Sequence, residues 1–330
     1  MADQGLTVAV TGPTGTFGFG LVPLLQDDPR VRRVVGIARR PFDPARHGWT
    51  KMEYRQGDVR DQEALRTAFA GADVVVHLAF LVVGGTRRTT RAINVDGTLN
   101  AFRAAAAAGV QRFVYASSVV AYGFHSDNPV GMTEDWPTRP AGLLSYAQEK
   151  AELEQLLGAE AAQHPEVDLY LLRPPVVLGP HTVGGKDLLP GPLAPLARSL
   201  QGRFRRLPVP VPVVVPELPL QLVHEDDVGQ ALLRCVVAAG PPGAYNIAGD
   251  GVLTAADVAR ELGFLPLRAP ALPAQAVSRV LSRLPLRGAA QWVEAGSNPA
   301  VMDTTKAKEE LGWRPRYTGL EALRATLDGP

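Results

Sequence analysis

Short hydrophobic runs rich in β-branched residues alternate with longer amphipathic stretches through the first half of the chain. The short runs, typical of buried strands, lie at residues 6–10, 32–38, 73–79 and 112–118. The longer stretches, typical of helices, lie at residues 19–26, 62–71 and 91–109. No hairpin signal separates the runs, so consecutive strands should be parallel and joined by helical crossovers. The pattern predicts an α/β fold, a doubly wound parallel sheet covered by helices on both faces.

The composition changes after one more strand-like run at residues 167–173. Residues 174–219 hold eleven of the 29 prolines, and the segment 207–219 is so rich in proline that it cannot be a helix and suits a central strand poorly. We expect this segment to be extended, either as a wall over a pocket or as a connector on the surface. Strand and helix patterns return from residue 220 to residue 313.

Composition narrows the range of partners. The chain has 330 residues, 46% of them hydrophobic, and a formal net charge of +1. This balance gives no long-range field for a polyanion, so nucleic acid is not expected as a partner. The one cysteine, Cys235, cannot form a disulfide within the chain, and the first residues lack the pattern of a secretory signal. The longest apolar run, 74–83, is about half of the ~20 residues that span a bilayer. We expect a cytoplasmic protein without a membrane span.

A glycine-rich loop joins the first predicted strand to the first predicted helix. Its sequence, VAVTGPTGTFGFG, places Gly12, Gly15 and Gly18 at this junction. Glycine there permits a tight turn and a close approach of the backbone to a pyrophosphate, and the helix N-terminus favours the phosphate charge. The loop therefore predicts a dinucleotide site.

The spacing Gly-x-x-Gly-x-x-Gly after Thr11 resembles the extended branch of the short-chain dehydrogenase/reductase superfamily, the branch that includes NAD-dependent epimerases and dehydratases. Further matching motifs are GDVRD, VVHLA, NVDGT, YASSVVAYG, SYAQEK, LRPPVVLGP, LVHEDDVGQA, YNIAGD and DTTKAKEELGWRP. The resemblance covers nearly the whole chain except the proline-rich segment and roughly residues 265–300.

The resemblance implies how the chain is organised. A Rossmann-type dinucleotide-binding domain would cover residues 1–178. A smaller, partly interleaved substrate subdomain would cover residues 179–330, with parts near 219–248 returning to the Rossmann core. A homodimer would form through helices 92–108 and 146–158.

The resemblance also implies which residues line the cofactor. They are Gly12, Thr14, Gly15, Thr16, Phe17, Gly18, Arg39, Arg40, Asp58, Val59, Leu78, Ala79, Ala116, Ser117, Tyr146, Lys150, Pro174 and Val176. At the end of the second strand, NAD-using relatives carry an acidic residue that accepts hydrogen bonds from ribose hydroxyls. Here Ala38 is followed by Arg39 and Arg40, and a guanidinium can bind a 2′-phosphate through two charge-assisted bonds. We therefore expect NADP, with NAD as the second choice; the alternative is that both arginines are simply exposed charges.

The stretch SYAQEK places Tyr146 and Lys150 four residues apart, on one face of a helix. A free phenol has a pKa near ~10, and a neighbouring ammonium lowers it by favouring the phenolate. The resemblance implies that Lys150 also bonds the nicotinamide ribose and that Ser118, four residues before Tyr122, completes a Ser-Tyr-Lys relay. An ordinary helix turn is the alternative. The residues predicted to contact the substrate are Phe80, Ser118, Val119, Tyr122, Tyr146 and His181.

Local departures from the superfamily guide the choice of reaction on a small-molecule substrate. Dehydratases carry an acidic pair directly after the relay serine, where this chain has Val119 and Val120. Sugar-nucleotide enzymes carry a diphosphate-binding asparagine where this chain has Val176. Together with the apolar segment 207–223, these residues favour an NAD(P)-dependent oxidoreductase that transfers hydride between the nicotinamide and a largely apolar carbonyl or secondary alcohol.

Two alternatives stay open. A nucleotide-sugar 4-epimerase could hold its diphosphate through Arg198, Arg203, Arg205 and Arg206. A dinucleotide-sensing regulator is the other, although such a protein has no need of an intact relay. The cluster HEDD at 224–227 is too close-set for a metal site without a second group of ligands, so no metal is expected.

Overall fold

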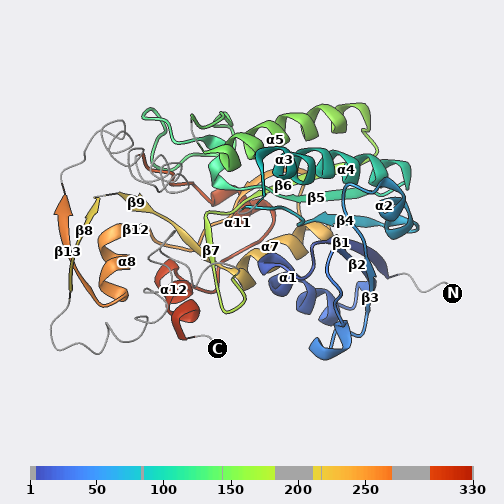
Figure 1. The fold of residues 1–330 in the computed structure, drawn as a ribbon, viewed down its shortest axis with the longest axis horizontal. Coiled ribbons are helices and arrows are strands. Elements are labelled where there is room, and N and C mark those ends of the chain that lie inside the picture. The colour runs from blue at the N-terminus through green and yellow to red at the C-terminus, as the bar shows by residue number, and fades with distance from the viewer. Residues whose placement is uncertain are drawn as a thin grey trace.

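Seven parallel strands form the central sheet of the computed structural model (Figure 1). The structure describes residues 5–82, 85–142, 144–182, 211–216, 218–269 and 298–328. The strands are β1 (Leu6–Thr11), β2 (Val31–Ala38), β3 (Met52–Gln56), β4 (Val74–His77), β5 (Arg112–Ala116), β6 (Asp168–Arg173) and β11 (Gly243–Asn246). Their order is β11-β6-β5-β4-β1-β2-β3, which confirms the predicted doubly wound, Rossmann-type sheet. The order reverses direction between β1 and β4, and such sheets bind ligands at the carboxyl ends of the strands beside this switch point.

Helices cover both faces of the sheet (Figure 1). They are α1 (Thr16–Asp27), α2 (Gln62–Phe69), α3 (Arg87–Arg91), α4 (Gly97–Ala107), α5 (Ser145–Gln163) and α7 (Glu225–Val236). Val8 and Val10 belong to the hydrophobic cluster with α1 and α7, whereas Ala9 belongs to the cluster with α2, α4 and α5. Both sides of β1 are therefore buried, which explains why this strand is apolar at consecutive positions. The other described helices include α8 (Ala255–Glu261), α11 (Thr305–Glu310), α12 (Gly319–Asp328), η1 (Pro44–His47), the π-helical turn η2 (Ala92–Asp96) and η3 (Val119–Tyr122).

Helices α1 and α7 touch backbone to backbone. A Cβ atom at Gly229 would lie 2.1 Å from the carbonyl oxygen of Gly20, and a Cβ atom at Gly20 would lie 2.2 Å from the carbonyl oxygen of Glu225. A side chain at either glycine would have to push the helices apart. The glycine pair therefore joins the helix that follows the glycine loop to a helix from the second half of the chain.

The last segment of the chain is attached to the start of α7. Trp313 is fully buried, and its indole nitrogen donates to the carbonyl oxygen of Asp227 at 2.9 Å. The carboxylate of Asp227 accepts hydrogen bonds from the backbone nitrogens of Arg316 and Tyr317, at 2.8 and 3.2 Å. These bonds satisfy a buried carboxylate. They fix residues 313–317 against the core.

Three two-stranded sheets lie outside the central sheet within the described ranges. They pair β7 (Val176–Leu178) with β10 (Leu222–His224), β9 (Pro219–Leu220) with β12 (Leu253–Thr254), and β8 (Val211–Pro216) with β13 (Phe264–Ala269). Strand β8 belongs to the proline-rich segment, which is extended there and lies at the end of the molecule opposite β3 (Figure 1). Its role as a wall or a connector stays a prediction, and residues 207–210 and 217 lie outside the described residues.

Residues 219–248 contribute to both ends of the molecule. Strands β9 and β10 belong to small sheets, whereas α7 packs against α1 and β11 forms the edge of the central sheet beside β6. The division of the chain at residue 178 into two domains stays a prediction. Among the helices that the structure describes, none is long and apolar enough to cross a membrane.

Candidate active site

The loop between β1 and α1 has a backbone shape that glycine alone permits. Gly12 has a φ of 69°, and a Cβ atom there would lie 3.0 Å from the backbone nitrogen of Ala79. A Cβ atom at Gly18 would lie 2.0 Å from the carbonyl oxygen of Pro13. Gly15 is the N-cap of α1 and gives the helix no side-chain cap. This loop therefore fits the pyrophosphate of a dinucleotide. Its other predicted contacts are the partly buried Thr14, Thr16 and Phe17.

Thr11, the last residue of β1, fixes the end of β4 beside this loop. Its hydroxyl oxygen accepts hydrogen bonds of 3.2 Å from the backbone nitrogens of Leu78 and Ala79 and bonds His77 Nδ1 at 2.9 Å. His77 Nε2 bonds the Thr98 hydroxyl at 3.0 Å. Burial lowers the pKa of His77 to about 3, so the ring is neutral. His77 therefore links two threonines and has a structural role.

The residues predicted to hold the adenosine half lie after β2 and β3. Arg39 and Arg40 are exposed, and Val59 is buried. The Asp58 carboxylate pairs with the Arg60 guanidinium, with 2.7 Å between Oδ2 and Nη2. The hydrogen bond from Arg60 lowers the pKa of Asp58, and the charge of Arg39 adds a smaller effect in the same direction. Arg39 therefore lies near enough to Asp58 for their charges to interact.

Ser118 and Tyr146 meet at the carboxyl end of β5. Ser118 is buried, and its hydroxyl makes a long, 3.4 Å hydrogen bond to the carbonyl oxygen of Pro174. Tyr146 is the second residue of α5. Burial raises the pKa of Tyr146, and a side-chain hydrogen bond with Ser118 acts in the opposite direction. Ser118 therefore lies close enough to Tyr146 to affect the pKa of its phenol.

Lys150, one turn further along α5, is buried among aromatic rings and oxygen atoms. Its ammonium donates to the Tyr115 hydroxyl at 2.9 Å and to the carbonyl oxygen of Ala116 at 2.6 Å. The Phe80 ring lies over the same ammonium, with 3.8 Å between Nζ and the ring centroid. The Phe80 ring also meets the Tyr146 ring edge to face, at 5.5 Å between centroids. Phe80 therefore touches two relay side chains.

Two acidic residues of α5 influence Lys150. Burial lowers the pKa of Lys150 to about 7, and the charges of Glu154 and Glu149 work against this. Glu149 accepts a hydrogen bond of 2.7 Å from the Asn94 amide, which also bonds the backbone of Leu81. The π-helical turn that carries Asn94 is thus tied both to α5 and to the loop after β4.

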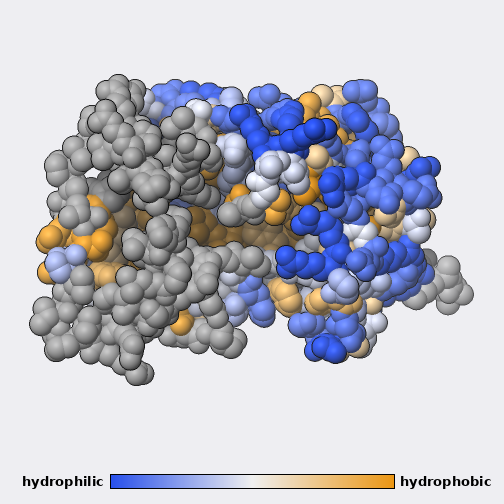
Figure 2. Space-filling view, viewed as in Figure 1, coloured by the Kyte–Doolittle hydropathy of each residue, from blue (hydrophilic) through white to orange (hydrophobic). Residues whose placement is uncertain are grey.

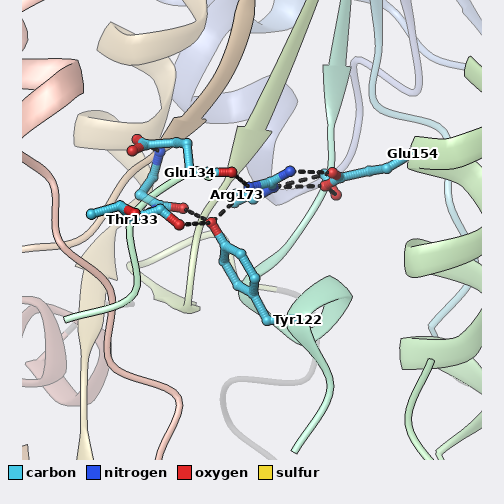
Figure 3. Close-up of polar contacts among 7 residues, drawn as sticks. Tyr122, Thr133, Glu134, Glu154 and Arg173 are labelled. Carbon is cyan, nitrogen blue, oxygen red and sulfur yellow. Dashed lines mark hydrogen bonds and ion pairs between the residues drawn. The ribbon is translucent and has the colours of Figure 1, made fainter. Parts of the chain in front are cut away.

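Arg173 and Glu154 form a buried ion pair (Figure 3). Arg173, the last residue of β6, donates from Nε and Nη2 to the carboxylate of Glu154 at distances of 2.5, 3.0 and 3.1 Å. Its Nη1 donates to the Tyr122 hydroxyl at 2.6 Å and to the carbonyl oxygen of Glu134 at 3.2 Å. Glu154 also accepts a hydrogen bond from the Ser117 hydroxyl. The pair joins the helix that carries the relay to strands β5 and β6.

The hydroxyls of Tyr122 and Ser117 both have protein partners. Tyr122 is fully buried, and its hydroxyl also bonds the Asn246 side chain at 2.8 Å and the carbonyl oxygen of Thr133 at 3.1 Å. Ser117 is buried with its hydroxyl on Glu154. Both hydroxyls are occupied by protein partners of the ion-pair network. The predicted contacts of Tyr122 with the substrate and of Ser117 with the cofactor stay predictions.

His181 lies against α1, next to the glycine loop. Its ring stacks on the Phe19 ring with 4.6 Å between centroids, and its Nδ1 bonds the Glu225 carboxylate at 2.7 Å. Its carbonyl oxygen accepts a 3.4 Å hydrogen bond from the Thr16 hydroxyl. Its predicted contact with the substrate stays a prediction.

The remaining predicted residues have different exposures. Val119 and Pro174 are buried, whereas Val176 is 59% exposed. The arginines of the epimerase alternative, Arg198, Arg203, Arg205 and Arg206, lie outside the described residues. Within the described ranges, no group of three or more His, Cys, Asp or Glu side chains could hold a metal ion.

No role in the site was predicted for Tyr115, Glu149, Glu154 or Arg173. A signal existed for Glu154, which lies four residues after Lys150 and continues the helix face of the relay. Acidic residues on a helix usually face solvent, so the pattern alone did not predict burial. The burial depends on Arg173, which a different element supplies.

Comparison with known proteins decides the family. The model of the NAD dependent epimerase/dehydratase family matches residues 8–248. The chain belongs to this family. The match runs from within β1 to just beyond β11 and therefore includes the glycine loop, the relay and all strands of the central sheet.

Several proteins resemble the chain along most of its length. Rv0501 of Mycobacterium tuberculosis (strain ATCC 25618 / H37Rv) is 29% identical over 330 residues, which cover 96% of this chain and 82% of that protein. UDP-glucose 4-epimerase from Thermotoga maritima, solved with UDP-glucose, superposes with a TM-score of 0.73 at 21% identity and 98% coverage of both chains. MoeE5, solved with UDP-glucuronic acid and NAD, gives a TM-score of 0.72 at 24% identity and 98% coverage of both chains. The two structures share the fold of this family member.

Proposed function

We propose that the protein is an NAD(P)-dependent oxidoreductase that interconverts a largely apolar carbonyl compound and the corresponding secondary alcohol. The observation that carries the proposal is the approach of Ser118 to Tyr146, together with the buried Lys150 ammonium one turn further along α5. Ser118 would hold the substrate oxygen, and Tyr146 would give it a proton in reduction or take one in oxidation. A charged Lys150 would favour the phenolate form of Tyr146 and so act against burial, which raises the pKa of Tyr146 in this structure. A bound nicotinamide dinucleotide supplies or accepts the hydride.

The residues of this chain fit such a cofactor. The first turn of α1 has no side-chain cap, so its backbone N–H groups can bind a phosphate. A side chain at Gly12 or Gly18 would come too close to neighbouring backbone atoms for the loop to keep its turn. Arg39 and Arg40 would bind the 2′-phosphate of NADP. Lys150 would hold the nicotinamide ribose, as the resemblance to the superfamily implies.

An apolar environment around Tyr146 supports an apolar substrate. Tyr146 and Trp136 pack against a buried cluster that includes Val119, Val120 and Phe124. Figure 2 shows a hollow near the middle of one face of the molecule, with hydrophobic residues on its floor. Apolar walls with a few placed polar groups are typical of sites for small apolar ligands, and they suit a charged diphosphate poorly.

A nucleotide-sugar 4-epimerase is the alternative enzyme. Its support is the fold shared with MoeE5 and the UDP-glucose 4-epimerase, whose structures contain UDP sugars. Val176 in place of a diphosphate-binding asparagine weighs against a sugar-nucleotide substrate.

The relay can be tested with Tyr146→Phe. The ring and its packing survive this change, and only the transferable proton is lost. We expect turnover to fall by about 10²-fold or more, because positioned acid–base catalysis contributes roughly 10²–10⁴-fold, with little change in cofactor affinity. Steady-state rates and titrations of cofactor fluorescence measure the two quantities. Undiminished turnover in the variant would exclude Tyr146 as the proton donor.

The substrate class needs a screen rather than a variant. Bulky apolar ketones and secondary alcohols should be converted with a change in NAD(P)H absorbance, and UDP- or GDP-sugars should be left unchanged. Efficient epimerisation of a nucleotide sugar would replace this proposal with the alternative. The Tyr146→Phe protein serves as the control for conversions that do not use the relay.

A further inference from the structure

The Lys150 ammonium has three close partners among the described residues. An ammonium carries three N–H groups. Two oxygen atoms accept from it, those of the Tyr115 hydroxyl and the Ala116 carbonyl, and the face of the Phe80 ring covers it. Lys150 is 3% exposed. A ribose hydroxyl could therefore bond this ammonium only by replacing one of the three partners.

Phe80 is the partner that can be replaced. Tyr115 and Ala116 belong to β5 in the middle of the sheet, and both are buried. Phe80 follows the end of β4, on the crevice side of the sheet, and its side chain is only partly buried. Rotating this partly buried side chain, which packs at the margin of a core cluster, costs less than moving a central strand.

We propose that Phe80 is a positioning residue whose ring holds the Lys150 ammonium and the Tyr146 phenol before the cofactor arrives and leaves the ammonium when the nicotinamide ribose binds. The inference rests on the proposed function, because it requires Lys150 to bond that ribose. A cation over an aromatic face is stabilised, most strongly where water is excluded. The ring therefore stabilises the cofactor-free protein and competes with the nicotinamide half of the cofactor.

Binding measurements on Phe80→Leu test the competition. Leucine keeps an apolar side chain and removes the ring face. We expect NADPH and NADH each to bind about fivefold more tightly to this variant than to the unaltered protein, the change that corresponds to the loss of one cation–π contact. ADP carries the adenosine half and both phosphates but no second ribose, so it should bind both proteins equally. Phe80→Tyr keeps the ring face and should behave like the unaltered protein.

The position of the ring can be followed directly by NMR. The chain contains five lysines, so selective ¹³C labelling of lysine gives few signals, and the Lys150 signal is identified by its absence in Lys150→Arg. The Phe80 ring current should shift the ε-methylene protons of Lys150 in the free protein. This shift should disappear on saturation with NADPH and in Phe80→Leu.

The outcomes separate this inference from the proposed function. Equal or weaker dinucleotide binding by Phe80→Leu, an equal gain in ADP affinity, or a ring-current shift that survives saturation would overturn the role of Phe80. Dinucleotide binding with the expected Phe80 effects but no turnover of any carbonyl or alcohol would overturn the oxidoreductase and leave the role of Phe80 standing. Failure of the unaltered protein to bind either dinucleotide would overturn both.

Discussion

Arg39 and Arg40 follow the last residue of β2, and both side chains are exposed. A guanidinium gains much more from a phosphate than from a neutral ribose hydroxyl. Arg39→Ala should therefore weaken NADPH binding by roughly 1.5–3 kcal/mol, the value of a hydrogen bond to a charged group, and leave NADH binding almost unchanged. Calorimetric titration of both cofactors measures this, with Arg66→Ala on α2 as a control. Equal losses for NADPH and NADH would contradict a phosphate contact at Arg39.

Lys150 should make the stability of the protein depend on pH in the alkaline range. Burial lowers its pKa to about 7 in the folded protein, whereas an unfolded lysine titrates near ~10.4. The unfolded chain therefore binds more protons between these values, so this residue's contribution to stability rises with pH from about 7 to about 10.4 and is constant below about 7.

Lys150→Met removes this dependence. At pH 7 the variant should be more stable than the unaltered protein by on the order of 1 kcal/mol. Its turnover should be lost. Functional residues often reduce the stability of a protein in this way. The difference should shrink as the pH approaches 10. Thermal unfolding of both proteins at several pH values measures it. If the variant is less stable than the unaltered protein at pH 7, burial of the Lys150 ammonium does not lower the stability of the folded protein.

At the scale of elements, the Glu154 and Arg173 ion pair fixes α5 against β6. Removal of one partner leaves a buried charge, so Glu154→Leu or Arg173→Met should each cost about 3–5 kcal/mol of unfolding free energy. The double variant should lose clearly less than the sum, because neither charge is then stranded. Urea denaturation of the four proteins completes the cycle. Glu152, also on α5, forms an exposed ion pair with Arg91 of α3. Glu152→Gln breaks this pair and should change the free energy of unfolding by less than about 0.5 kcal/mol. Additive losses in the cycle would argue against direct coupling.

The elements themselves were predictable to different degrees. Strands β1, β2, β4, β5 and β6 were predicted because their apolar runs are buried on both faces of the sheet. Strand β3 was not predicted, since it is the edge strand and only Met52 among its five residues is buried. The pairing of β8 with β13 was also not predicted, because proline makes β8 an unlikely strand and its partner lies far along the chain.

At the scale of the whole molecule, motif spacing predicted the approach of Ser118 to Tyr146, since a glycine loop, a strand end and a helix start fix the site in this fold. The spacing did not predict which hydroxyls face inward. Ser117 and Tyr122 belong to the same motif as Ser118, yet both serve the ion pair. Ser117 bonds Glu154 of α5, and Tyr122 bonds Arg173 of β6 and Asn246 of β11. Such contacts between distant segments leave no periodicity in the sequence.

The core beside α1 has a consequence for synthesis on the ribosome. This cluster contains Val8 from the first strand and Leu232 from α7, and it ends with Trp313 near the end of the chain. Chains emerge from the N-terminus, and segments that lack their packing partners expose apolar surface until the partners arrive. Helix α1 covers only part of this side of the sheet, which therefore stays incompletely covered until α7 and Trp313 have been translated. The central sheet and its covering helices cannot be completed before β11 and α7, from the second half of the chain, have been made.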